Sequence, residues 1–416
     1  MSTKQINNDN SFWYEPFIDN GIIPDFILRA AIRHILRGRA YELEGNEFTE
    51  KHINKMLYIE KLKERPIAEE QDAANKQHYE VSTGFMKLSL GKRMKYSCAL
   101  FPTGKETLDQ AEDLMLESYC EKAQVKDGMK ILDLGCGWGS LCLYICEKYP
   151  NAKVTALSNS YTQRKHIQSL ADERGYKNLT VTTADVKEFD FEEESRFDRI
   201  ISIEMFEHMK NYEHLLHKIS TWLTSNGLLF LHTFAHKSQP YDFVEDDSWM
   251  TRYFFTGGTM PSSDLFLHFQ NDLTLVNKWL VNGKHYAKTS EEWLKLVDKN
   301  KKDGFPYLVE TYGRENAEAW FNRWRTFYIS VAEFFGMNDA GTILGHKGIG
   351  IVEEVDKVKP GERVVISCFV VPIGLLVISF AKDRGVNHML RLAIACRDDK
   401  LHRRERRHRK DQVACA

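Results

Sequence analysis

The chain has 416 residues, with 57 basic and 59 acidic side chains and a net charge of −2. This length allows a large apolar core plus an accessory region, and the charge balance excludes a strong overall attraction to nucleic acid. Residues 1–10 are polar, so we expect no secretory signal. The eight cysteines show no paired framework, which favours a reducing, cytoplasmic setting.

In chain order, Phe26 to Leu62 is typical of amphipathic helices with basic faces. The basic faces of these helices are either simply exposed to solvent, or the helices form a cap over a binding site. Further along, Met129 to Leu134 is a short apolar run that predicts a buried parallel strand. The glycines of Gly135 to Gly139 follow it, and Leu141 to Tyr149 has helical periodicity. A strand, a glycine turn and a helix bring backbone N–H groups close to a ligand.

The glycine loop fits NAD poorly. Ser140 stands where a dinucleotide fingerprint has its third glycine, and the next strand, Lys153 to Leu157, ends without a carboxylate. Asp133 and the Gly-x-Gly-x-Gly spacing instead favour a class I methyltransferase loop that binds S-adenosylmethionine. A glycine-rich turn without any ligand is the remaining alternative.

Alternating strands and helices predict an α/β fold with a mostly parallel sheet. The further strands are expected at Leu179–Thr183, Phe197–Ile203, Leu228–Phe234 and Leu273–Leu280. Ligands of such sheets lie beyond the carboxyl ends of the strands, so Gly135, Asn159, Asp185 and Glu204 should share one edge. There Asp185 could accept from an adenine amine, and Asn159 and Gln163 could hold ribose hydroxyls.

The segment Ser202 to His208 (SIEMFEH) follows the fourth strand. If a helix starts there, Glu204, Glu207 and His208 at i, i+3 and i+4 share one face. Three interpretations remain open: a solvated acidic helix start, a metal site, or general acid–base chemistry. The motif matches no zinc helix pattern and has no identifiable outside ligand, so we expect no metal.

Long motifs between Ile22 and Asn338 resemble the coclaurine N-methyltransferase family of plant alkaloid metabolism and, more broadly, the cyclopropane-fatty-acyl-phospholipid synthase superfamily. They are HYEVSTGFMKLSLGKRMKYSCALF, LDLGCGWGSLCLYI, FDRIISIEMFEHMKNY, WMTRYFFTGGTMPSS, WLVNGKHYAKTSEEWL and WRTFYISVAEFFG. The resemblance implies a class I, Rossmann-like methyltransferase domain over residues 91–338 beneath an N-terminal helical cap over 1–90. It also implies S-adenosylmethionine as cofactor and a small-molecule amine as substrate.

The resemblance assigns roles to particular residues. Glu204, Glu207 and His208 would orient and deprotonate the amine, because an alkylamine is mostly protonated at neutral pH. The implied cofactor-binding residues are Tyr96, Ser97, Asp133, Gly135, Gly137, Asn159, Gln163, Asp185, Val186 and Ile203, and the implied substrate-binding residues are Tyr79, Glu80, Trp324 and Phe327. Tyr253, Phe254 and Phe255 form a further aromatic cluster for cation–π contact, with core packing as the alternative, and Met260 is expected in a lid.

The cyclopropane synthases imply a different reaction, methylation of a lipid double bond with a bound bicarbonate. The residues that match their bicarbonate pocket are Cys98, Glu207, His232 and Tyr286. Those synthases generally have glycine at the position of Glu204, and an extra carboxylate suits a cationic amine better than an acyl chain. The residues therefore favour an amine and leave a lipid as the alternative.

The C-terminal part departs from the resembling proteins, which continue into a final strand after Asn338. Residues 339–375 resemble a fragment of zinc-dependent medium-chain dehydrogenases, with Lys347 in place of a zinc-ligand glutamate and Ile373 in place of a structural cysteine. This fragment could partly replace the missing strand. Residues 364–381 form an uncharged run that is a weak candidate for a tail anchor, and 376–416 predict a disordered basic tail. A homodimer is a further expectation.

Overall fold

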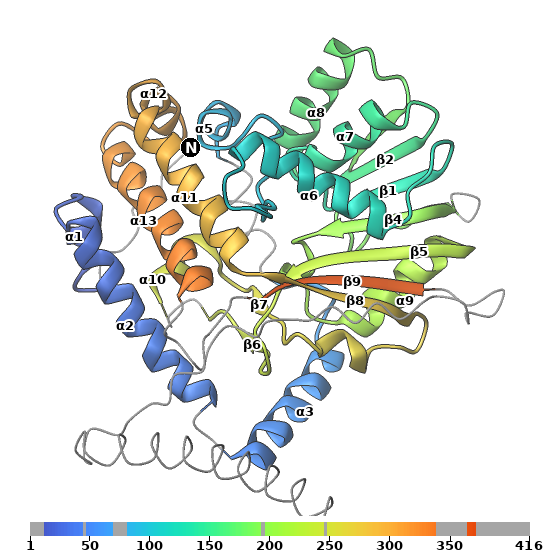
Figure 1. The fold of residues 1–416 in the computed structure, drawn as a ribbon, viewed down its shortest axis with the longest axis horizontal. Coiled ribbons are helices and arrows are strands. Elements are labelled where there is room, and N and C mark those ends of the chain that lie inside the picture. Colours follow the sequence, from blue (N-terminus) through green and yellow to red (C-terminus); the bar gives the residue numbers. More distant parts are fainter. Residues whose placement is uncertain are drawn as a thin grey trace, which may run out of the picture. The chain divides into compact units, whose positions relative to one another are not determined.

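The computed structural model describes residues 12–44, 47–69, 81–192, 196–244, 248–337 and 364–371. Within them, a parallel sheet has seven strands in the order β3-β2-β1-β4-β5-β9-β8. The strands are β1 Lys130–Leu134, β2 Lys153–Ser158, β3 Leu179–Thr183, β4 Phe197–Ile203, β5 Leu223–Phe234, β8 Thr274–Asn282 and β9 Val364–Val371. The strand order reverses between β1 and β4, and a crevice at such a switch point is where α/β sheets bind ligands. The predicted α/β fold and parallel sheet are confirmed (Figure 1).

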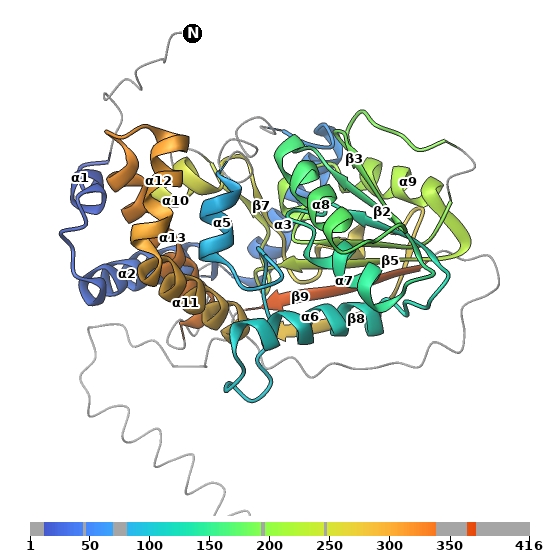
Figure 2. The same ribbon diagram turned by 90° about the horizontal axis from the view of Figure 1, so that it is seen from above.

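Helices cover both faces of the sheet (Figure 2). On one face lie α6 (Leu108–Lys122), α7 (Ser140–Lys148) and α8 (Tyr161–Glu173), and on the other α3 (Phe48–Glu64) and α9 (Tyr212–Trp222). Alternation along the strands divides the core accordingly. Ile131 packs with the first group of helices, whereas its neighbour Leu132 packs with the second, because successive side chains of a strand point to opposite faces.

A helical layer stands beside the carboxyl edge of the sheet (Figure 1). Its elements are α1 Glu15–Asp19, α2 Asp25–Glu44, α5 Thr83–Ser89, α10 Trp249–Phe254, α11 Lys284–Lys299, α12 Lys301–Tyr312 and α13 Ala317–Gly336, with a hairpin of β6 Tyr241–Asp242 and β7 Thr259–Met260 nearby. Arg29 of α2 pairs with Glu291 at 2.6 Å and with Glu333 at 2.9 Å. The cap thus combines the predicted N-terminal helices with helices from the far end of the methyltransferase region.

Strand β9 lies between β5 and β8 and pairs in parallel with both. Its pairing with β5 begins at Leu228 opposite Val364, and its pairing with β8 ends at Asn282 opposite Val371. Part of the aberrant C-terminal segment therefore occupies a place inside the sheet. The tail-anchor alternative for 364–381 is wrong over 364–371, because these residues form a strand with two partners rather than a helix. The rest of 339–375 and the tail 376–416 lie outside the described residues.

Removing β9 is expected to abolish cooperative unfolding. A chain that ends at residue 338 leaves β5 and β8 without the strand that pairs with both, and their N–H and C=O groups lose their partners. A chain that ends at residue 375 keeps β9 and is the matched control. Thermal unfolding followed by circular dichroism measures the difference, and an unchanged Tm for the shorter chain would contradict the placement of β9.

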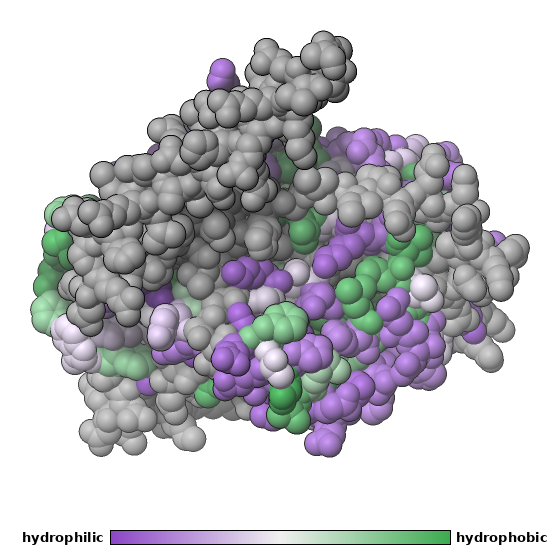
Figure 3. Space-filling model, turned by 60° about the horizontal axis from the view of Figure 1, so that its bottom comes forward, coloured by the Kyte–Doolittle hydropathy of each residue, from purple (hydrophilic) through white to green (hydrophobic). Residues whose placement is uncertain are grey.

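No helix in the described part of the chain is long and apolar enough to cross a membrane. On the face shown in Figure 3, hydrophilic residues cover most of the described surface, and hydrophobic residues lie in separate patches. The predicted homodimer and cytoplasmic location stay predictions.

Candidate active site

The glycine loop joins β1 to α7 at the switch point of the sheet. Gly135, Gly137 and Gly139 have φ angles of 82°, 50° and 86°, a region that favours glycine. A Cβ on Gly135 would meet the Met205 side chain at 2.5 Å, whereas a Cβ on Gly137 would enter open space. The loop is thus packed on one side and open on the other. Asp133 accepts from the backbone N–H of Cys142 at 3.0 Å, and burial raises the pKa of Asp133 to about 7.

Two adjoining cavities open at this carboxyl edge, and Gly135, Gly137, Gln163 and Glu204 line both of them. The first, which we call the adenosine-side cavity, is further lined by Leu134, Leu157, Ser158, Asn159, Ala184, Val186, Met205, His208 and Met209. The second, the methionine-side cavity, is further lined by Met94, Lys95, Tyr96, Ser97, Leu116, Tyr119, Asp133, Cys136, Trp138, Ser140, Leu141 and Ile203. The structure therefore brings together most of the residues predicted to bind the cofactor.

The chemistry of the cavities fits S-adenosylmethionine. Gln163 Oε1 accepts a hydrogen bond from the Ser158 hydroxyl at 2.6 Å. The buried Nε2 of Gln163 has no hydrogen-bond partner among the described residues. An orphaned buried donor of this kind calls for a ligand acceptor such as a ribose hydroxyl. Asn159 is exposed at the same end. Asp185 lies between two lining residues but accepts from the backbone N–H of Lys187 at 2.8 Å, so its contact with adenine stays a prediction.

The helix expected to start at Glu204 is absent. Glu204 has φ of +48°, and Phe206–His208 forms a single 3₁₀ turn. The physical reason is strand pairing: the backbone N–H of Glu204 still donates to His232 O of β5 at 2.7 Å. The prediction that Glu204, Glu207 and His208 share one helix face is therefore wrong. Glu204 and His208 line the adenosine-side cavity together, and Glu207 lines neither cavity.

Glu204 is held by donors from distant parts of the chain. Its Oε1 accepts from the backbone N–H of Cys98 at 2.9 Å, and its Oε2 accepts from the Tyr286 hydroxyl at 2.8 Å. Burial raises the pKa of Glu204, and the Lys95 ammonium opposes that shift. Lys95 is itself 1% exposed and donates to Ser97 Oγ at 2.5 Å. The carboxylate is thus fixed at the boundary of both cavities.

Glu207 is fully buried and points elsewhere. Its Oε1 accepts from the backbone N–H of Phe234 at 2.7 Å, and its Oε2 has no partner among the described residues. Burial, and then repulsion from Glu204, raise the pKa of Glu207 well above its ordinary value. Both effects favour the protonated form of the carboxyl, and its hydrogen bond from Phe234 N–H anchors the 3₁₀ turn to β5.

His208 faces the cavity as an uncharged imidazole. Burial, with a smaller contribution from the Lys210 ammonium, lowers the pKa of His208 to about 4. The ring packs against Phe255 with 5.1 Å between centroids. An uncharged imidazole at neutral pH can accept a proton.

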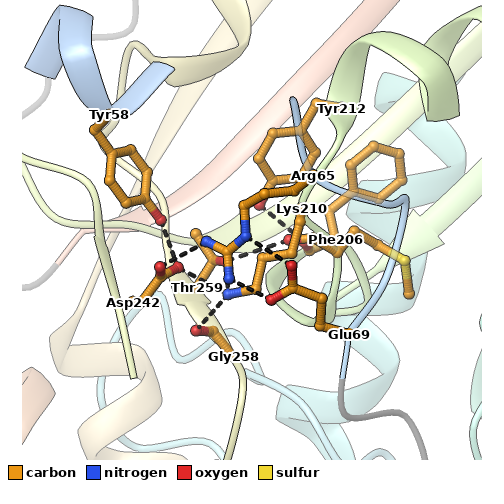
Figure 4. A network of polar contacts seen from close by, with 10 residues as sticks. Tyr58, Arg65, Glu69, Phe206, Lys210, Tyr212, Asp242, Gly258 and Thr259 are labelled. Carbon is orange, nitrogen blue, oxygen red and sulfur yellow. Dashed lines mark hydrogen bonds and ion pairs between the residues drawn. The ribbon is translucent and has the colours of Figure 1, made fainter. Parts of the chain in front are cut away.

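A buried polar network holds the turn that carries His208 (Figure 4). Lys210 is 0% exposed and donates to Asp242 at 2.8 Å, to Thr259 Oγ1 at 2.8 Å and to Gly258 O at 3.0 Å. Tyr58 of α3 and Arg65 also donate to the Asp242 carboxylate, at 2.7 and 2.6 Å. The network joins helix α3, strands β6 and β7 and the turn that carries His208.

Replacing Asp242 with asparagine is expected to lower the free energy of unfolding by about 3 kcal/mol, because it leaves the buried Lys210 charge uncompensated. Burial raises the pKa of Asp242, but Lys210 and the hydrogen bonds outweigh it and hold that pKa below its ordinary value. The wild-type stabilisation is therefore present above the unfolded pKa and lost as pH falls through the folded one. Urea denaturation at pH 7 and pH 3 measures both effects. The exposed Asp303→Asn variant is the control, and an equal change in both variants would refute the role of Asp242.

Aromatic rings form a wall between His208 and Tyr286. Phe255 packs against Phe234 at 5.5 Å, Phe234 against Phe335 at 6.1 Å, and Phe335 against Tyr286 at 4.6 Å between centroids. The sequence analysis missed Phe234 and Phe335, because they come from β5 and α13 and share no local pattern. The strand order could have predicted that Phe234 lies near the site, because Phe234 is the last residue of β5 and β5 lies beside β4.

Other predicted substrate residues lie differently. Trp324 is 0% exposed and Phe327 is 8% exposed. Inside the helical cap, Phe327 stacks on the buried Phe254 and Trp324 meets it edge-on, and neither lines the two cavities. Met260 is buried in β7, where it follows Thr259. Tyr79 and Glu80 lie outside the described residues.

The proposed bicarbonate residues already have partners. Cys98 N–H and the Tyr286 hydroxyl bind Glu204, and Glu207 binds Phe234 N–H. His232 Nδ1 lies 2.5 Å from the Tyr119 hydroxyl. A carboxylate of the chain itself therefore takes up two of the donors that an exogenous anion would use.

Comparison with known proteins is consistent with this geometry. A family model for mycolic acid cyclopropane synthetase matches residues 67–340. The chain is 40% identical over 329 residues to (S)-coclaurine N-methyltransferase of Thalictrum flavum subsp. glaucum, which covers 77% of this chain and 90% of that relative. It is 28% identical over 257 residues to cyclopropane-fatty-acyl-phospholipid synthase of Escherichia coli (strain K12), covering 61% and 62%.

Among solved structures, coclaurine N-methyltransferase bound to N-methylheliamine and SAH superposes with a TM-score of 0.76 and 38% identity, covering 79% of this chain and 96% of that chain. The class I methyltransferase fold is confirmed. The match to the family model ends at residue 340, and the dehydrogenase resemblance of 339–375 gains no support. The chain belongs to the mycolic acid cyclopropane synthetase family and is an S-adenosylmethionine-dependent methyltransferase.

Proposed function

We propose that this chain methylates the nitrogen of an amine that carries an aromatic ring system, of the benzylisoquinoline type. The single observation that carries the proposal is the pairing of Glu204 with His208 in one cavity beside the glycine loop. Relatives named for coclaurine, pavine and tetrahydroprotoberberine N-methylation support it, with 34–40% identity.

The two side chains have complementary tasks. The Glu204 carboxylate attracts the substrate ammonium, and the His208 imidazole accepts its proton, which leaves a lone pair on nitrogen. Bound S-adenosylmethionine supplies an electrophilic methyl group on its sulfonium. The nitrogen lone pair forms the new N–C bond while the C–S bond breaks, and the sulfur leaves as a neutral thioether.

Glu207 acts through position in this proposal. Its Oε1 accepts from the backbone N–H of Phe234, which fixes the turn that lies between Glu204 and His208. The Lys95 ammonium opposes the rise that burial causes in the Glu204 pKa and so favours the ionised carboxylate that the ammonium needs, while burial lowers the pKa of Lys95 itself. The contacts of Tyr79 and Glu80 with the amine are carried over from the family resemblance alone.

A chain of packed aromatic rings, none of which lines the two cavities, supports the proposed substrate class. The rings of Phe255, Phe234, Phe335 and Tyr286 run from the proposed base to the partner of Glu204. Ring faces attract an ammonium by about 0.5–2 kcal/mol when it is desolvated, and they pack against an aryl substituent. An amine without an aryl group forgoes the second contact.

The alternative is methylation of a lipid double bond with bound bicarbonate. Its supporting observation is that Cys98, Glu207, His232 and Tyr286 all surround the Glu204 region. Against it, the Glu204 carboxylate occupies the Cys98 and Tyr286 donors, and a buried negative charge disfavours an acyl chain.

Product analysis tests the proposal. The protein is incubated with S-adenosylmethionine and either tetrahydroisoquinoline or piperidine, which share a cyclic secondary amine and differ in the aryl ring. We expect N-methyltetrahydroisoquinoline by mass spectrometry, with kcat/KM at least tenfold above that for piperidine. No methylated amine from a panel that also includes benzylated tetrahydroisoquinolines would refute the proposal.

A further inference from the structure

A third cavity, which we call the basic cavity, lies beside the cofactor cavities and plays no part in the proposed chemistry. It has a volume of 490 Å³. Helices α5, α6, α7, α8 and α11 surround it, together with the loop that connects α5 to α6. Met94 and Ser140 line both this cavity and the methionine-side cavity. A ligand here would therefore touch the start of α7, directly after the glycine loop.

The inner wall of the basic cavity is apolar. Five leucines line it, from five different segments: Leu90, Leu108, Leu143, Leu170 and Leu296. All five are buried or half-buried. A wall of this kind stabilises an apolar ligand body by roughly 25 cal/mol for each Å² removed from water, which a small inorganic ion cannot provide.

The rim carries uncompensated positive charge. Lys87, Lys92 and Arg174 line the cavity and are exposed. Among the described residues, no ion pair involves Lys87 or Arg174. Two acids also line the cavity: Glu292 pairs with Lys295 at 2.8 Å, and Asp109 accepts only a backbone N–H in the cavity, that of Lys92 at 2.9 Å, so the three cations still leave an excess of positive charge.

His166 adds a buried polar group. It is 7% exposed, and its Nε2 has no hydrogen-bond partner among the described residues. His166, Leu170 and Arg174 follow one another at i, i+4 and i+8 along one side of α8 and its C-cap, and all three line the cavity. Burial, and then the charges of Lys87 and Arg174, lower the pKa of His166 to about 4.

We propose that the basic cavity binds an organic phosphate with an apolar body. The body would lie against the leucine wall, and the phosphate would lie between Lys87, Lys92 and Arg174. Arginine and lysine are the usual partners of phosphate, and His166 Nε2 would gain the partner it lacks. The site is separate from the methyl-transfer site, and the proposal does not depend on the amine substrate.

Isothermal titration of the full chain with 1-naphthyl phosphate tests the proposal. S-adenosylhomocysteine is kept at saturation so that the cofactor cavities are filled. We expect saturable binding that the double variant Lys87→Glu/Arg174→Glu weakens at least tenfold, since two attractive charges become repulsive. The matched control is Arg164→Glu/Lys165→Glu, which reverses two exposed charges of helix α8 that do not line the cavity. This control should bind 1-naphthyl phosphate as the wild type does.

Two further probes separate the parts of the site. Inorganic phosphate has the charge without the body, and 1-naphthol has the body without the charge; each should bind at least tenfold more weakly than 1-naphthyl phosphate. Equal binding of either probe, no saturable binding of 1-naphthyl phosphate, or equal loss in both double variants would overturn the proposal. Thermal melts of the variants verify that each one is folded.

Discussion

Replacing His208 with alanine is expected to lower turnover at pH 7 by about 10²–10⁴, the usual contribution of a positioned general base. Burial and Lys210 lower the pKa of His208 to about 4, so the wild-type ring is uncharged throughout the neutral range. Without it, only the fraction of amine that is already deprotonated reacts. That fraction rises about tenfold per pH unit below an amine pKa near 10, so turnover of the variant should recover from pH 7 to pH 9.

The pH–rate profile of kcat measures this effect in the wild type, in His208→Ala and in the control His214→Ala. His214 is an exposed residue of the nearby helix α9, and its removal should leave the profile unchanged. Turnover of His208→Ala equal to that of the wild type at pH 7 would exclude His208 as the base. A uniform loss that pH does not restore would assign it a structural role instead.

Replacing Glu204 with glycine should separate activity from stability. Glu204 has φ of +48°, which costs an L-residue about 1–2 kcal/mol and costs glycine little. Removal of the carboxylate leaves Cys98 N–H and the Tyr286 hydroxyl unpaired, at a cost of about 1–3 kcal/mol. These effects offset one another, so the free energy of unfolding should change by less than about 2 kcal/mol.

The activity of the same variant should fall steeply. A carboxylate about 4 Å from an ammonium contributes up to about 4 kcal/mol near a protein surface, so kcat/KM for the amine should drop by about 10²–10³. Added formate fits the space left in Glu204→Gly and should restore part of the rate. The amide of Glu204→Gln fills that space, so formate should not help this companion variant. Wild-type kcat/KM in Glu204→Gly would contradict the account.

The strands were predictable because buried parallel strands are apolar runs between turn residues. The bounds expected for Leu179–Thr183 and Phe197–Ile203 agree with β3 and β4 residue for residue. β5 starts earlier than predicted, at Leu223, because Leu223 pairs with Phe197 before an irregularity in the register. The edge rule likewise located the adenosine-side cavity, since Gly135, Asn159 and Glu204 all line it.

The details of the site depended on contacts that a local pattern cannot contain. The i, i+3, i+4 spacing predicted a helix at Glu204, but pairing with β5 prolongs the strand and a left-handed residue then turns the chain. Cys98 and Tyr286, which hold Glu204, lie 106 and 82 residues away in sequence. Trp324 is fully buried, and its helical periodicity suits a core position as well as a substrate contact, so its substrate role stays a prediction.

The most direct test of the central claim is a competition between the two substrate classes. S-adenosylmethionine with a labelled methyl group is mixed with the protein, a benzylated tetrahydroisoquinoline and vesicles of unsaturated phospholipid, with and without bicarbonate. The Glu204–His208 pairing predicts that label enters the amine fraction and that bicarbonate has no effect on its rate. Label in the lipid fraction alone, at a rate that depends on bicarbonate, would contradict it.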